Sequence, residues 1–205
     1  MVSDCGCAIE ARNAKERQTL LIVLGINAFM FVFELILGLV AESTGLIADS
    51  LDMLADACVY SISLYAIGRS NILKRRAAKF SGIVQSVLAF FVIFEAIRRF
   101  IFGSEPLSLW IIAVGCLALI ANSICLTLIS KHKNGEVHMR ASAIFSANDV
   151  IANIGVILSG VLVLLLDSRY PDLIIGLIIA AIVFRGGLKI IQEAQKSNST
   201  YSESS

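Results

Sequence analysis

Residues 108–130 read SLWIIAVGCLALIANSICLTLIS and contain no charged side chain. About 20 mostly apolar residues, rising 1.5 Å each, form a helix long enough to cross the hydrocarbon core of a bilayer. Further stretches of this kind lie on both sides of it, at 19–41, 46–68, 77–101, 143–166 and 172–192. Helices are expected because an open strand would leave backbone groups unpaired in hydrocarbon. The sequence therefore predicts an all-α, polytopic membrane protein with six transmembrane helices.

The composition supports the same class of protein. Of the 205 residues, 57% are hydrophobic and only 16% are charged, whereas a soluble domain is about 45–50% apolar. The net charge of +1 gives no basic excess, so a nucleic-acid partner is not expected. The five cysteines are an odd number spread along the chain, which does not indicate a disulfide framework. Cys5 and Cys7 form the motif DCGC, which fits either capture of a soft metal or a reduced tail.

The basic residues predict an orientation in the membrane. All of the 17 Lys and Arg except Arg98, Arg99 and Arg169 fall in segments on one side of the six-span arrangement. By the positive-inside rule, both termini are therefore expected in the cytoplasm. The predicted domains are a cytoplasmic N-terminal segment (1–18), a six-helix transmembrane domain (19–192) and a disordered cytoplasmic tail (193–205).

Acidic residues occur inside the predicted spans, where an Asp at the bilayer centre costs roughly 2.5–3.5 kcal/mol. The second span contains Asp49, Asp52 and Asp56. At 3.6 residues per turn, these three carboxylates lie within an arc of about 60° on one helix face. The fifth span adds Asp149, with Asn153 one turn further along the same face and Asn148 beside it.

Carboxylates gathered on one face repel one another, and either protons or a bound cation would relieve the repulsion. Carboxylate pairs from two helices can supply oxygen ligands at about 2.0–2.6 Å from a divalent metal. The sequence therefore indicates a metal site of Asp52, Asp56 and Asp149, with Asp49, Asn148 and Asn153 as further contributors. The alternative is that these groups are neutral and hydrogen-bonded between helices as packing contacts.

At these residues the sequence resembles the cation diffusion facilitator, or cation efflux, family. GLVAESTGLIADSLDMLADA (38–57) is similar to that family's first-to-second-span segment, where a His or Asp is followed four residues later by Asp. Those positions are Asp52 and Asp56 here. SANDVIANIGVILSG (146–160) resembles the fifth-span motif, and YPDLIIGLIIA (170–180) resembles the start of the sixth span.

The resemblance implies an exporter of divalent metal, most often zinc, with cobalt, cadmium, iron and manganese as alternatives. It also implies that the metal is exchanged for protons and that the protein works as a homodimer. It implies no tightly bound cofactor, since the metal is transported, and it implies a bacterial inner membrane location. Two departures stand out. Phe145 occupies the position four residues before Asp149 where the family has a ligand, and the chain resembles short members without a C-terminal cytoplasmic domain.

Two other functions fit membrane-embedded carboxylates. An intramembrane aspartyl protease also uses two Asp that share a proton, but Asp149 lies in SAND rather than in a Gly-x-Gly-Asp context, so no enzyme is expected. A metal-binding or partner subunit that does not transport is the second alternative, and metal flux into proteoliposomes distinguishes it from a transporter.

Overall fold

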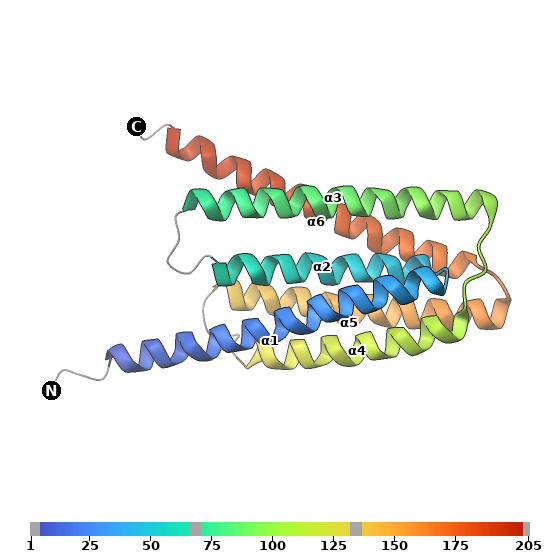
Figure 1. Cartoon of the computed structure of the whole chain (residues 1–205), viewed down its shortest axis with the longest axis horizontal. Coiled ribbons are helices and arrows are strands. Elements are labelled where there is room, and N and C mark those ends of the chain that lie inside the picture. Colours follow the sequence, from blue (N-terminus) through green and yellow to red (C-terminus); the bar gives the residue numbers. More distant parts are fainter. Residues whose placement is uncertain (1–4, 66–70, 132–136, 203–205) are drawn as a thin grey trace.

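The chain forms a bundle of α-helices (Figure 1). The computed structural model describes residues 5–65, 71–131 and 137–202, and it describes side chains for 17–62, 64, 76, 79–131 and 146–192. In chain order the helices are α1 (Cys5–Val40), α2 (Thr44–Tyr65), α3 (Asn71–Phe102), α4 (Ser108–Ser130), α5 (Val137–Leu166) and α6 (Tyr170–Ser202). No strand occurs within those described ranges, and the predicted all-α class is confirmed.

Successive helices run in opposite directions along the bundle (Figure 1). The start of α1 and the end of α6 lie at the same end, which we call the terminal end. The connections 41–43, 103–107 and 167–169 lie at the opposite end, which we call the turn end. This arrangement requires an even number of passes, as the six-span prediction does.

Within the described residues, five helices contain a segment long and apolar enough to cross a membrane: Arg17–Val40, Lys79–Phe102, Ser108–Ser130, Ser146–Leu166 and Tyr170–Gln192. They correspond to five of the six predicted spans. The sixth, α2, has 22 residues and is therefore about 33 Å long, enough to cross, but its three Asp lower its hydropathy. The tail predicted to be disordered from residue 193 is helical as far as Ser202.

The central helix is α2, because it packs against each of the other five helices. Around it, α3 pairs with α6, α4 pairs with α5, and α1 packs on α4. Large exposed apolar side chains occur on all five outer helices, and among the described residues α2 has none. The helix that carries the acids is thus enclosed by protein, while its neighbours present an apolar surface to the bilayer.

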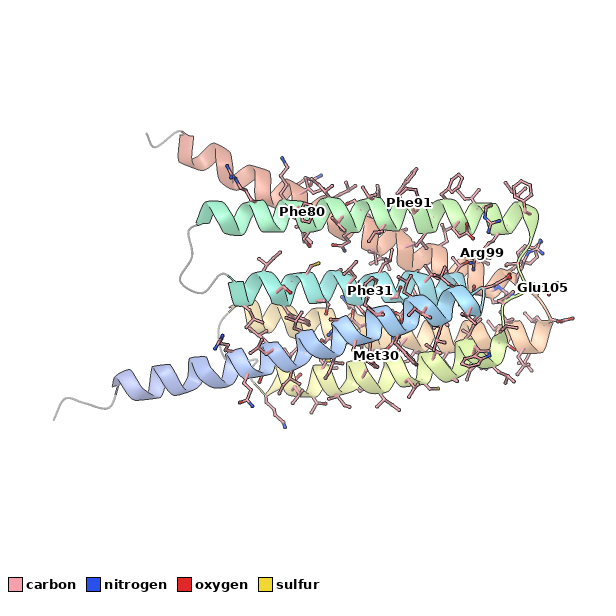
Figure 2. The ribbon with its side chains drawn as sticks, viewed as in Figure 1. Met30, Phe31, Phe80, Phe91, Arg99 and Glu105 are labelled. Carbon is pink, nitrogen blue, oxygen red and sulfur yellow. The ribbon has the colours of Figure 1, made fainter. Side chains whose placement is uncertain are left out.

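The outer surface is richest in aromatic side chains on α3. Phe80 is 70% exposed and Phe102 is 80% exposed, and Phe91 lies at the upper surface of the bundle in Figure 2. So many exposed aromatic side chains would make a water-soluble protein prone to association. On a surface that faces lipid, they are expected.

A close approach between α6 and α2 depends on Gly176. A Cβ atom at this position would lie 2.6 Å from the Thr44 carbonyl carbon and 2.8 Å from the Gly45 nitrogen. These are backbone atoms at the first turn of α2, which cannot move aside as a flexible side chain would. A residue without a side chain is therefore required where α6 crosses the start of α2.

Gly176→Ala should destabilise the protein by about 1–3 kcal/mol, because the added methyl group must push the two helices apart. The measurement is the midpoint of thermal unfolding of the purified protein in detergent. Gly25→Ala is the matched control, since a Cβ atom at Gly25 meets nothing within 4 Å and alanine favours the helix. Equal midpoints for the two variants would contradict the close-packing argument.

Candidate metal-binding site

The first turn of α2 is held by a carboxylate from another helix. Asp172, near the start of α6, is 1% exposed. Its Oδ1 accepts a hydrogen bond from Ser43 Oγ at 2.6 Å and one from the Gly45 N–H at 3.2 Å. Its Oδ2 accepts a hydrogen bond from the Thr44 N–H at 2.6 Å. The N–H groups of a first helical turn have no partner within their own helix, so this anion satisfies them and complements the helix dipole.

A second contact reaches the same turn from α3. Arg99 is 5% exposed, donates from Nη1 to Thr44 Oγ1 at 3.4 Å and donates from Nε to Glu95 at 2.8 Å. Figure 2 shows Arg99 near the turn end of the bundle. Together, Asp172 and Arg99 tie α2 to α6 and α3, and they fix the height at which the acids further along α2 lie.

Three predicted carboxylates meet between α2 and α5. The Asp149 carboxyl lies within hydrogen-bonding range of the Asp52 and Asp56 carboxyls. Asp149 is 5% exposed and Asp56 is 6% exposed, while Asp52 is half-buried. We call these three residues the inner cluster. Ionised carboxylates only accept hydrogen bonds, so such proximity requires a proton or a cation between them.

The other predicted contributors lie elsewhere. Asn148 is exposed and lies about 100° around α5 from the buried Asp149. Asn153 is fully buried and donates from Nδ2 to Asp49 Oδ2 at 2.7 Å, so these two residues pair with each other one turn from the inner cluster. The side chain of Phe145 lies outside the described residues.

Tyr60 contacts the inner cluster and was not among the predicted residues. Its hydroxyl donates to Asp56 Oδ2 at 2.9 Å and lies 3.4 Å from Ser146 Oγ. Tyr60 follows Asp56 by four residues and is 1% exposed, so helical spacing could have placed it on the same face. It limits the rotamers open to Asp56 and closes the cluster toward the terminal end.

Two side chains from α1 and α4 complete the surroundings. Asn27 donates from Nδ2 to Cys125 Sγ at 3.8 Å and to the Val23 carbonyl at 2.9 Å. Cys125 is fully buried and lies within electrostatic range of Asp56 and Asp149. The structure places a soft sulfur atom near an otherwise all-oxygen set of groups.

The acids are gathered, but their ligand atoms do not converge on one point. Within residues 17–62, 79–131 and 146–192, no group of three or more His, Cys, Asp or Glu has the geometry to hold a metal ion. A bound cation would therefore have to draw the carboxylates of the inner cluster together through side-chain rotation.

Comparison with known proteins places most of the chain in one family. Residues 20–197 match the cation efflux transmembrane domain family. The chain belongs to the cation efflux family. The matched range contains α2 to α5 completely and most of α1 and α6, and it includes the positions of Asp52, Asp56 and Asp149.

Characterised relatives of the chain are metal transporters. It is 23% identical to the zinc transporter ZitB of Yersinia pseudotuberculosis over 91% of its own length and 64% of the relative's. It is 24% identical to ZitB of Escherichia coli K12, over 90% of its own length and 62% of the relative's. It is 21% identical to the cadmium, cobalt and zinc/H(+)-K(+) antiporter of Bacillus subtilis, over 89% and 63%. The chain thus spans a little under two thirds of the length of these relatives.

Asp172→Asn should lower stability by about 1–3 kcal/mol, because an amide turns an N–H₂ donor toward donors of the first turn of α2. We expect a lower unfolding midpoint in detergent, with the helical circular dichroism signal of the folded protein retained. Asp167→Asn, at an exposed turn position, is the control with the same chemical change. An unchanged midpoint for Asp172→Asn would mean that the carboxylate does not hold α2.

Proposed function

We propose that this protein carries a divalent metal cation out of the cytoplasm across a bacterial inner membrane, in exchange for protons. The observation that carries the proposal is the inner cluster, in which Asp52, Asp56 and Asp149 are brought together inside a bundle that faces lipid. Acids in such a place are rare outside ion and proton pathways.

Charge balance favours a cation as the substrate. Ion pairs in the part of the chain with described side chains are those of Glu95 with Arg98 and Arg99, so no Lys or Arg there is paired with the inner cluster. Three carboxylates without a basic partner must take up protons or a metal ion, because isolated buried charges are strongly disfavoured. A divalent ion neutralises two charges at once.

The same groups explain why protons would move in the opposite direction. A carboxylate must lose its proton before it can bind a metal, so metal binding releases protons and falls in strength as the pH is lowered. Proton return to the emptied carboxylates then restores a neutral cluster that can reorient. The printed name of the Bacillus relative, an antiporter that includes H(+), supports this coupling.

Zinc is the cargo that we propose. The relatives' names support it. So does the Cys125 sulfur, which lies within electrostatic range of Asp56 and Asp149, since sulfur ligands favour zinc over harder ions such as Mn²⁺. We propose a homodimer as the assembled form, with no tightly bound cofactor and no nucleic-acid partner. We propose no enzymatic activity.

Asp52→Asn, Asp56→Asn and Asp149→Asn should each abolish zinc flux into proteoliposomes while expression and insertion stay normal. An amide keeps the shape of the carboxylate, weakens metal ligation and is easier to bury. Asp167→Asn, which carries the same change at an exposed position, should transport like the parent. Parent-like flux in all three variants would show that these carboxylates only pack the helices.

A parent protein that binds zinc without carrying it would instead support the alternative of a non-transporting metal-binding or partner subunit. Flux should be measured with and without a pH gradient, since the exchange mechanism predicts faster uptake when protons can leave.

The positive-inside argument places the terminal end in the cytoplasm and the turn end outside. Reporters inserted at Ser104 and Ser168, both at the turn end, should therefore be external, and a reporter fused after Ser205 should be cytoplasmic. An internal reporter at Ser104 would overturn the proposed orientation and, with it, the proposed direction of transport.

A further inference from the structure

Glu34 of α1 is a buried acid that the inner cluster does not use. Its side chain is 0% exposed, and no donor among the described side chains and backbone reaches Oε1 or Oε2. A buried polar atom without a partner is rare in a folded protein, because it forfeits its interaction with water without compensation. No donor group of the described residues therefore offsets the loss of water at this carboxyl.

The Glu34 carboxyl faces a second acid across the α1–α2 interface. It lies within hydrogen-bonding range of the Asp49 carboxyl, and Asp49 is 1% exposed. Neither group can donate when ionised. The two carboxyls can therefore lie this close only with a proton shared between them or with a cation bound by both.

A chain of amides holds Asp49 in place from the other side. Asn122 of α4 donates from Nδ2 to Asn153 Oδ1 at 3.1 Å, and Asn153 of α5 donates to Asp49 Oδ2 at 2.7 Å. Asn122 is 2% exposed and Asn153 is 0% exposed. Four helices, α1, α2, α4 and α5, thus each contribute one buried polar side chain to the same region. Such convergence from several helices is typical of a binding site.

We propose that Glu34 and Asp49 form a second divalent-cation site, the outer site, with Asn153 and Asn122 fixing the orientation of Asp49. The donors are carboxylate oxygens, which suit hard divalent ions. Among the described residues, neither acid is paired with a basic side chain, since the ion pairs there involve Glu95. A cation between the two carboxyls would satisfy the oxygens of Glu34 and neutralise both charges.

The outer site lies on the turn-end side of the inner cluster. Asp49 precedes Asp52 by three residues, which is about 4.5 Å along the α2 axis. An ion leaving the inner cluster toward the turn end therefore meets the outer site next. Its role as an exit step rests on the proposed transport function, whereas binding at the outer site can be measured without any transport.

The test is Mn²⁺ binding to the purified full chain in detergent, followed by the loss of the free Mn²⁺ signal in electron paramagnetic resonance. The background is Asp56→Asn, which disables the inner cluster. This variant should still bind Mn²⁺. Adding Glu34→Gln should weaken that binding by at least about tenfold, the scale on which single groups around a metal matter. Adding Glu105→Gln, at an exposed position of the 103–107 connection, should leave it unchanged.

Two results would overturn the proposal: no Mn²⁺ binding by Asp56→Asn, or equal binding with and without Glu34→Gln. Asp49→Asn in the same background provides the second variant if Glu34→Gln does not give monodisperse protein, and it should weaken binding similarly. Zinc flux separates this proposal from the preceding one. If the parent protein carries no zinc but its Mn²⁺ binding depends on Glu34, the transport proposal alone is refuted. If Glu34→Gln carries zinc and binds Mn²⁺ as the parent does, the outer site alone is refuted.

Discussion

The fold depends on one constraint, which is that a helix carrying three carboxylates cannot face lipid. An acid at the bilayer centre is disfavoured by roughly 2.5–3.5 kcal/mol, so α2 is tolerated only where protein surrounds it. The structure meets this requirement by packing all five other helices on α2. The described part of α2 presents no large apolar side chain to the outside, whereas its neighbours do. The acids therefore determine which helix becomes the centre of the bundle.

Enclosure alone would not bring the acids to their partners, because a helix can slide along its axis. A shift by one residue moves a side chain 1.5 Å along the axis and 100° around it, enough to turn Asp52 and Asp56 away from Asp149. The Asp172 carboxylate prevents this by binding the first turn of α2 through Ser43, Thr44 and Gly45. Because Gly176 has no side chain, α6 can approach the start of α2 closely enough for Asp172 to accept these hydrogen bonds. A structural contact at the turn end thus determines the geometry of the site further along the helix.

Hydropathy and helical spacing could predict much of this, and their limits are physical. The α4 bounds, Ser108–Ser130, equal the predicted span, because a charge-free apolar stretch has sharp ends. The shared face of Asp52 and Asp56 follows from 3.6 residues per turn. Spacing fixes an azimuth on one helix, however, and does not say which helix that face meets. For this reason Asn153, which shares a helix face with Asp149, was predicted at the metal site but instead donates a hydrogen bond to Asp49. For the same reason the contacts of Tyr60 and Asp172 were not predicted.

The polar groups along α2 occupy two levels, and their spacing bears on how an ion could move. Asp49 lies within electrostatic range of Asp52 and Asp149, so a cation at either level lowers the negative potential felt at the other. Occupancy of the inner cluster would then weaken binding at Glu34 and Asp49, and the reverse. Binding that is strong enough to draw in an ion, but weakened by a second one, is what conduction through adjacent sites requires. In the proposed mechanism, the two levels joined by the Asn122–Asn153 amides would give the ion a nearby alternative, and this would account for the burial of Glu34.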